Sequence, residues 1–166
     1  MNTPDLTTER IRILWLEAEN NPGVLSRVTG MIRRRGFNIQ SISAAPTERP
    51  NRSRMTLSVD AGGGEVDQVE KQLDRLIEVT DIADITEQKE LVRELLLVRL
   101  NGVGERQEEL NKLLAEAGGR IIEEEAGELT VEISGWHHSM PRLISELGSF
   151  GIIGLARSGP LAISGK

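Results

Sequence analysis

The turn at residues 20–25, Asn-Asn-Pro-Gly-Val-Leu, has the clearest potential for chemistry in this chain of 166 residues. It precedes an amphipathic segment, so it should stand at the start of a helix, where unpaired N–H groups carry a partial positive charge. Gly23 would let a small anion such as a carboxylate approach the backbone without a Cβ in the way. The same residues also describe a simple capped turn, with an asparagine as the cap and Pro22 at the first helical position.

Groups for catalysis are scarce. The two histidines, His137 and His138, are adjacent and point in different directions on a strand or helix, so they do not form the i, i+4 pair of a metal site. We expect them in a solvated loop or at a helix start, and we expect no metal site. The chain has no cysteine, no Gly-x-Ser-x-Gly turn and no Gly-Lys-Ser/Thr phosphate loop. The sequence therefore gives no support to hydrolase, kinase or thiol chemistry.

Two glycine pairs begin like a dinucleotide-binding fingerprint. Gly102 and Gly104 are followed by Gln107 at the place of the third glycine, and the pair at 62 and 64 is followed by Asp67. Because the third glycine allows the helix to pack closely on the strand, both pairs are interpreted as turns.

The composition indicates a soluble globular protein. Hydrophobic residues make up 38% of the chain, and its net charge is −6, which disfavours nucleic acid and anionic membranes as partners. RNA-recognition domains share the element order predicted below but stack bases on exposed aromatic side chains, and the first half contains only Trp15 and Phe37. There is neither a basic start with an apolar core nor an apolar run of about 18 residues. We expect a cytoplasmic location.

The hydrophobic pattern predicts a strand, a helix, two hairpin strands, a helix and a strand in the first half. A strand buried on both faces is expected at 11–18 and a half-buried one at 55–60. Ile39 and Ile42 lie three apart within the second strand, which indicates a bulge or a change of register. The other expected elements are a helix over 24–35, a strand over 37–47, a helix over 66–77 with Ile77 facing inward and a strand over 79–86.

The second half repeats this pattern. Strands are expected at 94–100, 120–124, 129–134 and 151–157, with helices over 105–117 and 141–150. The boundary between the halves falls near residues 87–90. The predicted fold class is therefore α+β, with two ferredoxin-like βαββαβ domains of roughly 80 residues each, small enough to gain buried surface by oligomerisation.

Several motifs carry a resemblance to a known family. The segments Leu16–Val28 and Arg35–Ile39 resemble the ACT domain of the acetohydroxyacid (acetolactate) synthase regulatory small subunit. The hairpin motif Ala-Pro-Thr-Glu at 45–48, followed by Pro50 and by Ser-Arg-Met-Thr at 53–56, is similar to a signature of that subunit. Ala-Arg-Ser-Gly at 156–159 is similar to its closing motif. The resemblance covers residues 10–160.

The resemblance implies a non-catalytic subunit that activates a separate thiamine-diphosphate enzyme and lets valine, leucine or isoleucine inhibit it. It also implies a homodimer of ACT domains, with the effector held between the helix start of one chain and the second strand of the other. The implied effector-binding residues are Asn20, Gly23, Val24, Leu25, Ser26, Asn38 and Ile39. For Ser26, a first-turn hydroxyl without contact to a ligand is the alternative.

The same resemblance divides the chain into a leader (1–9), an ACT domain for effector binding and dimerisation (10–86), a C-terminal ferredoxin-like domain (91–160) and a tail (161–166). Thiamine diphosphate, magnesium and FAD are expected in the catalytic large subunit, and no cofactor in this chain. Residues placed to contact that subunit are Glu48, Arg49, Arg52 and Arg54; a solvated loop is the alternative for them. The alternative functions are an ACT-type amino-acid sensor for a different partner and an enzyme with an unrecognised site.

Overall fold

A computed structural model describes residues 11–60, 66–88 and 92–163. The expected leader, the glycines at 62–64 and residues 89 and 90 of the expected boundary lie outside these residues. The chain forms two compact units: Val92–Ser158 is one, and the segments before and after it belong together in the other. Among the described residues, no helix has the length and apolar character needed to cross a membrane.

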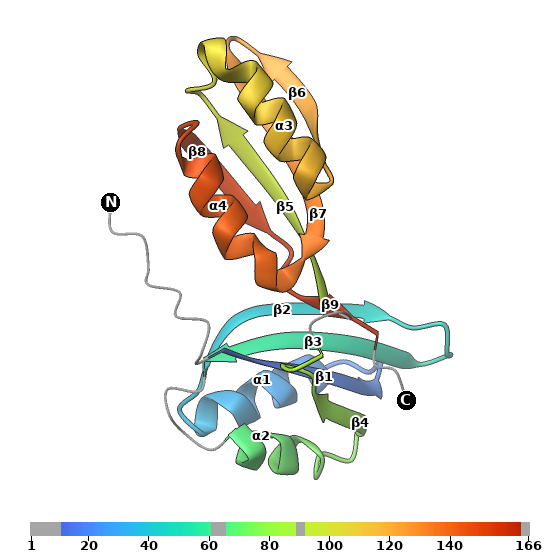
Figure 1. Ribbon diagram of the computed structural model, residues 1–166. Coiled ribbons are helices and arrows are strands. Elements are labelled where there is room, and N and C mark those ends of the chain that lie inside the picture. Colours follow the sequence, from blue (N-terminus) through green and yellow to red (C-terminus); the bar gives the residue numbers. More distant parts are fainter. Residues whose placement is uncertain (1–10, 61–65, 89–91, 164–166) are drawn as a thin grey trace. The chain divides into compact units, whose positions relative to one another are not determined.

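The first unit has the predicted βαββαβ order, with α1 and α2 on one face of an antiparallel sheet (Figure 1). The strands lie in the order β2-β3-β1-β4, so β2 and β4 form the edges. Its elements are β1 (Ile11–Glu19), α1 (Val24–Arg34), β2 (Asn38–Pro46), β3 (Arg52–Asp60), α2 (Val66–Leu73) and β4 (Val79–Asp84).

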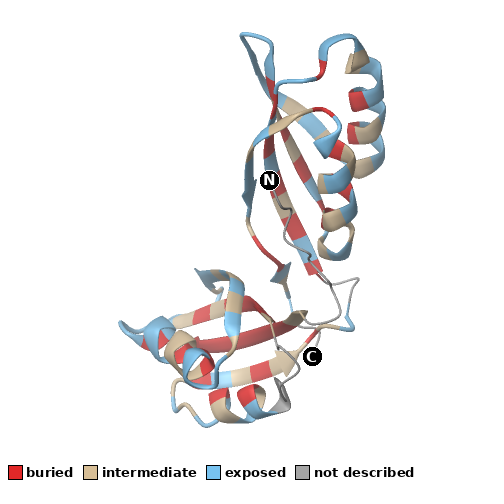
Figure 2. Ribbon diagram, turned by 90° about the vertical axis from the view of Figure 1, so that its left-hand side faces the viewer, coloured by how far each residue is buried: buried red, intermediate tan, exposed pale blue. Residues whose placement is uncertain are grey.

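The central strand β1 is buried on both faces, as predicted. Leu14 and Leu16 lie in the core beneath the helices, whereas Trp15 points to the opposite face and is only 5% exposed. The apolar stripe of α1 packs onto the same core through Val24, Val28 and Ile32. Figure 2 shows that buried residues lie on both the strands and the helices. Burial of these aliphatic side chains, at about 25 cal/mol per Å² of apolar surface, is the main force that holds the helix on the sheet.

The predicted irregularity in β2 is confirmed. The pairing of β2 with β3 shifts register between Ile39 and Ser41, which inserts one extra residue. As a result Ile39 lies opposite Val59 and Ile42 opposite Leu57, so both isoleucines share the helix-covered face although they are three residues apart.

The second unit has the same layout on a separate sheet, in the order β6-β7-β5-β8, with α3 and α4 on one face (Figure 1). Its elements are β5 (Val92–Leu100), α3 (Gln107–Ala117), β6 (Gly119–Glu125), β7 (Glu128–Trp136), α4 (Met140–Gly148) and β8 (Ile152–Arg157). Two short 3₁₀ turns, Gly104–Arg106 and His137–Ser139, precede α3 and α4.

Three local predictions are wrong. The helix α2 ends at Leu73 rather than near 77, and the side chain of Ile77 is 90% exposed instead of facing the core. The strand β3 is buried on both faces, because Thr56 and Ser58 on its second face are covered as fully as Leu57. Finally, α1 begins at Val24, so Pro22 does not occupy the first helical position.

The end of the chain returns to the first unit. A strand β9 (Leu161–Ala162) falls within the expected tail. Just before it, Gly159 is buried with a φ of +71°, and a Cβ there would lie 2.5 Å from the Oγ atom of Ser41. A side chain at residue 159 would therefore clash with β2 as well as strain the backbone.

Candidate functional site

The site begins at the connection from β1 to α1. The backbone N–H of Asn20 donates to the carbonyl of Asn51 at 3.0 Å, which ties the end of β1 to the hairpin turn between β2 and β3. The Asn21 side chain donates to the carboxylate of Glu19 at 2.8 Å instead of capping the helix. The residues of this connection are exposed, so the helix start is open to solvent.

Gly23 is the N-cap of α1, and its backbone is left-handed, with φ +88° and ψ −10°. No side chain in the described part of the chain caps this helix, so the predicted asparagine cap is wrong. The N–H of Val24 donates to the carbonyl of Asn21 at 3.3 Å, whereas those of Leu25 and Ser26 belong to the first turn and have no partner four residues back. The amides best placed for an anion are therefore those of Leu25 and Ser26.

Arg27 adds positive charge to the helix start, and sequence reasoning missed it. One of its terminal nitrogens would lie 3.1 Å from a Cβ on Gly23, and the other forms a 2.7 Å ion pair with Glu78. The signal in the sequence was a basic residue one helical turn after the glycine, on the same face as the open amides. No acidic residue lies in the first turn of α1.

The strand residues of the predicted site lie elsewhere in the unit. Asn38 opens β2 directly after α1 and is exposed, and Ile39 follows it with a half-buried side chain. The helix has 11 residues and is thus roughly 16 Å long at 1.5 Å per residue. Within one chain, therefore, Asn38 and the helix start stand at opposite ends of α1 and do not share a site.

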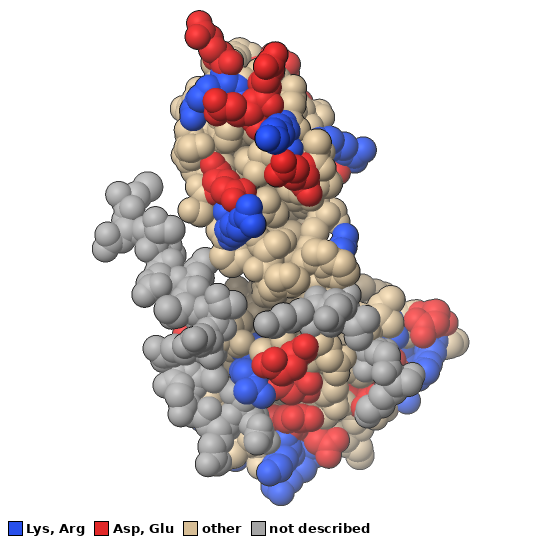
Figure 3. All heavy atoms as spheres, viewed as in Figure 1, with Lys and Arg blue, Asp and Glu red and all other residues tan. Residues whose placement is uncertain are grey.

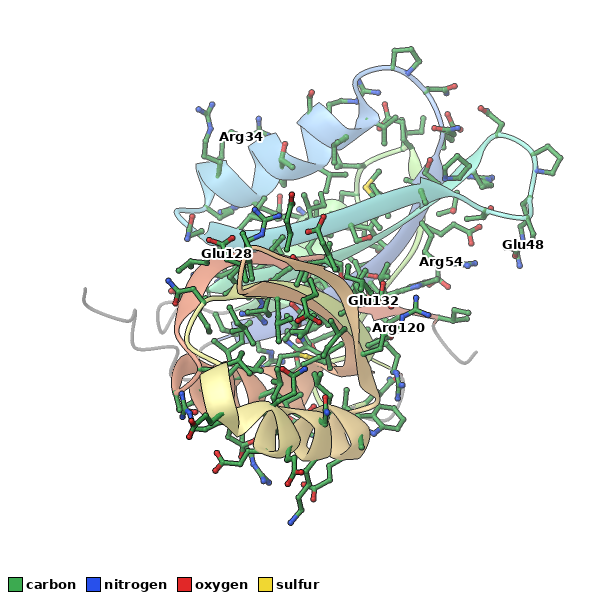
Figure 4. All side chains as sticks on the ribbon, turned by 90° about the horizontal axis from the view of Figure 1, so that it is seen from above. Arg34, Glu48, Arg54, Arg120, Glu128 and Glu132 are labelled. Atoms are coloured by element: carbon green, nitrogen blue, oxygen red, sulfur yellow. The ribbon has the colours of Figure 1, made fainter. Side chains whose placement is uncertain are left out.

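The hairpin between β2 and β3 brings the predicted contact residues together. Figure 4 shows Glu48 at its turn and Arg54 on the strand that leaves it. Arg54 forms ion pairs with Glu48 at 3.6 Å and with Glu17 at 3.5 Å, and Arg49 reaches Glu17 at 3.2 Å. A backbone hydrogen bond, together with Arg54 and Arg49, lowers the pKa of Glu48 from its ordinary value.

A buried charge cluster in the second unit was also missed. The carboxylate of Glu94 accepts hydrogen bonds from Arg157 at 2.7 and 3.0 Å, and its Oε2 lies 2.6 Å from Nδ1 of His137. His137 lies at the start of the 3₁₀ turn before α4, in agreement with the predicted helix start, and its side chain is 18% exposed. An acidic residue at an inward position of the apolar strand β5 was the signal. Burial raises the pKa of Glu94, but hydrogen bonds from His137 and Arg157 outweigh it and hold the pKa below 4.5.

Neither cluster has the form of a metal or catalytic centre. No group of three or more histidine, aspartate or glutamate side chains in the described part of the chain could hold a metal ion. Acidic and basic side chains alternate on the face drawn in Figure 3, without a large area of one sign in either unit. What the fold offers is an open helix start on a small βαββαβ unit, the architecture of ACT-type domains.

Comparison with known proteins places the chain within that class. A family model described as the AHAS small subunit-like ACT domain matches residues 14–81, and one described as the small subunit of acetolactate synthase matches residues 93–166. The chain belongs to the acetolactate synthase small-subunit family, whose members are regulatory and leave catalysis to a large subunit.

Individual relatives agree with this assignment. The chain is 39% identical to the probable acetolactate synthase small subunit of Archaeoglobus fulgidus over 87% of its own length and 91% of that protein. It is 34% identical to the acetolactate synthase small subunit of Haemophilus influenzae, over 92% and 94%. The crystal structure of the Thermotoga maritima small subunit superposes with a TM-score of 0.77 at 29% identity, over 93% of this chain and 96% of that one.

Proposed function

We propose that this chain activates the catalytic large subunit of an acetolactate synthase and makes it sensitive to feedback inhibition by a branched-chain amino acid. The observation that carries the proposal is the uncapped start of α1 in a chain of this family. Thiamine diphosphate, magnesium and FAD would be bound by the large subunit. In this role the protein would act in the cytoplasm, in valine, leucine and isoleucine biosynthesis.

The helix start suits the carboxylate of an amino acid. The amides of Leu25 and Ser26 and the partial charge of the helix would hold its oxygens, with the guanidinium of Arg27 near by. The carbonyl or side-chain oxygen of Asn20 is suited to the ammonium group. Leu25, whose side chain is 44% exposed, would cover one side of the aliphatic side chain.

The remaining half of the site would come from a second copy of the chain. β2 is an edge strand, and its side chains Ile42 and Ala44 remain exposed on the face that α1 covers only in part. Side-by-side pairing of two first units would cover this edge. It would also bring Asn38 and Ile39 of one copy to the helix start of the other, so the effector site and the homodimer form together.

The hairpin residues Glu48, Arg49, Arg52 and Arg54 are the proposed contact with the large subunit. The side chain of Arg49 is 68% exposed, and it contacts Glu17 at 3.2 Å. Because ion pairs of exposed side chains are weak, Arg49 could exchange this contact for one with the large subunit. Charged residues at the rim of an interface mainly affect the rate of association and its dependence on salt. A weakened complex at higher ionic strength is therefore expected.

The experiment is an acetolactate-formation assay with the large subunit from the same source, alone and mixed with this chain. Addition of the chain should raise the rate, and valine, leucine or isoleucine should lower it again only in the mixture. No increase would refute the proposal. In that case, calorimetric binding of a branched-chain amino acid would favour an ACT-type sensor for a different partner, and product formed by this chain alone would favour an enzyme.

A further inference from the structure

The face of the first unit's sheet opposite the helices contains a hollow of about 270 Å³, whose lining includes three arginines of the hairpin proposed to contact the large subunit. We call it the arginine hollow. The strand β1 contributes Trp15 and Glu17, and the hairpin contributes Arg49, Arg52 and Arg54. Thr80 and Asp81 from β4 complete its lining. Because Leu14 and Leu16 point into the core beneath the helices, Trp15 and Glu17 point to the opposite side of the sheet.

Three N–H donors in this lining are buried and have no acceptor among the described residues: Trp15 Nε1, Arg52 Nη1 and Arg54 Nε. Such donors are rare, because a buried polar group without a hydrogen bond is costly, and a buried tryptophan N–H usually has a partner. Trp15 is 95% buried, so solvent at the surface does not serve it. Three unpartnered donors around one hollow point to an acceptor that the described part of the chain does not supply.

The ion pairs around the arginine hollow leave one arginine available to an anion. The lining holds three arginines, which remain protonated, together with Glu17 and Asp81, and Glu48 at the hairpin turn lies 3.6 Å from Arg54. Glu17 already contacts Arg49 at 3.2 Å and Arg54 at 3.5 Å, and Arg52 makes no ion pair with the described residues. Arg52 is therefore the arginine of the hollow without an ion-pair partner among the described residues, and it also has an unpartnered buried nitrogen.

We infer that the arginine hollow binds the carboxylate of a small free molecule, in addition to the ligand proposed at the helix start. Planar guanidinium groups hold planar carboxylates through paired N–H donors, so Arg52 and Arg54 would bind the two oxygens, with the indole N–H of Trp15 as a third donor. The entering ligand displaces Arg49, which is 68% exposed and contacts Glu17 at 3.2 Å and Glu48 at 4.0 Å. Because the three unpartnered N–H donors are buried, a short-chain acid can reach them, whereas a carboxylate on the surface of a bulky protein cannot.

The chain itself provides the probe for this inference. It has two tryptophans, Trp15 in the first unit and Trp136 in the second, so its ¹H–¹⁵N spectrum contains two indole signals. Sodium acetate and sodium pyruvate are titrated into the full-length chain against sodium chloride at equal ionic strength. The Trp15 signal should move and saturate with either carboxylate, while that of Trp136 stays in place.

Substitutions assign the effect to the hollow. In Arg52→Gln the apparent affinity for acetate should fall roughly tenfold or more, because a charged donor is lost. Arg33→Gln, which changes an exposed arginine on α1, should bind as the wild type does. The amide spectra of both variants show whether they are folded, and an Arg54→Lys variant, which removes the Nε donor but keeps the charge, replaces Arg52→Gln if that chain unfolds.

Two results would overturn the inference. One is a Trp15 signal that does not move, or that moves as much with chloride as with carboxylate. The other is an Arg52→Gln chain that binds acetate and pyruvate as tightly as the wild type does but no longer activates the large subunit. That result would assign the hollow to subunit docking. The titration uses this chain alone, so its outcome does not depend on whether the proposed activation is found.

Discussion

The two units follow the same path through β, α, β, β, α and β elements but differ where the first helix begins. In the first unit no acidic residue lies in the first turn of α1, and a left-handed Gly23 leaves the amides open. In the second, Glu108 and Glu109 occupy the first turn of α3, after a 3₁₀ turn that contains Glu105. The second helix start thus supplies its own negative charge. One fold can therefore favour or repel an anionic ligand according to the residues of a single turn.

Both units also bury a carboxylate on the central strand, with different consequences. Glu94 lies on the helix-covered face of β5, fully enclosed between Arg157 and His137. Glu17 lies on the face of β1 opposite the helices, and one of its partners, Arg49, is mostly exposed. The cluster in the second unit is suited to hold strands together, whereas that in the first can exchange partners.

The largest effect is expected from breaking the second unit's cluster. Glu94→Gln removes the buried counter-charge of Arg157, whose side chain is 29% exposed, so the free energy of unfolding of this unit should fall by about 1.5–3 kcal/mol. Urea unfolding followed by Trp136 fluorescence, in a Trp15→Phe background, measures the second unit selectively. Trp15 fluorescence in a Trp136→Phe background should report an unchanged first unit.

Glu146→Gln is the matched control for that change. Glu146 forms a 2.7 Å pair with Arg142 on the surface of α4, and the Arg142 side chain is 81% exposed. Surface pairs of this kind contribute about 0.3–0.5 kcal/mol. A loss for Glu94→Gln no larger than for Glu146→Gln would show that the buried cluster does not stabilise the unit.

The next effect concerns the helix start. Gly23→Asp places a carboxylate beside the proposed ligand carboxylate, and like charges about 4 Å apart should weaken the binding of branched-chain amino acids roughly tenfold to several-hundredfold. Gly23→Asn has nearly the same shape without the charge. Both variants should lose about 1 kcal/mol of stability because the backbone here has a φ of +88°. Titration calorimetry measures the affinity of branched-chain amino acids for both variants. Equal affinities for Gly23→Asp and Gly23→Asn would show that the helix start is not part of the site.

Acid should weaken the second unit through Glu94. Its pKa in the folded chain lies below 4.5, so the ionised carboxylate stabilises this unit fully above about pH 4.5 and the stabilisation is lost as the pH falls through the lower folded pKa. The difference in unfolding free energy between wild type and Glu94→Gln should therefore shrink as the pH falls below about 4.5. A difference that stays constant with pH would contradict the ion pair.

The smallest effect comes from making α1 more like α3. Ser26→Glu adds an acidic residue to the first turn, which should raise the unfolding free energy of the first unit by about 0.3–1 kcal/mol and weaken effector binding severalfold. Ser26→Gln controls for size. Trp15 fluorescence during urea unfolding gives the unfolding free energy, and calorimetry gives the affinity for the effector. A rise in both quantities would exclude competition between the new carboxylate and the effector.

The fold was largely predictable because its core follows simple periodicities. Val24, Val28 and Ile32 mark one face of a helix, and the spacing of Ile39 and Ile42 predicted the bulge that the register confirms. The end of α2 was not predictable in this way. Leu76 and Ile77 continue the helical spacing, yet the helix stops at Leu73 and a turn follows, which leaves Ile77 in solvent.

The candidate site was predictable only in part. The sequence indicates a helix start with a glycine, but a left-handed backbone at Gly23 cannot be distinguished from a helical one by residue type. Long-range partners were also hidden. Nothing near Glu94 in the sequence indicates that Arg157 and His137 enclose it, because those contacts depend on how β8 and the turn before α4 meet β5.

The contact between Gly159 and Ser41 affects how the protein is made. Ser41 lies on β2, near the start of the chain, and Gly159 comes after all of the second unit. A ribosome synthesises the chain from the N-terminus, so six of the first unit's elements emerge well before Gly159, which follows the second unit and lies against β2. The second unit can fold in the meantime, since Val92–Ser158 is continuous in the sequence. The unit that begins first is thus completed last, and its sheet must wait for its final contact with an exposed edge strand.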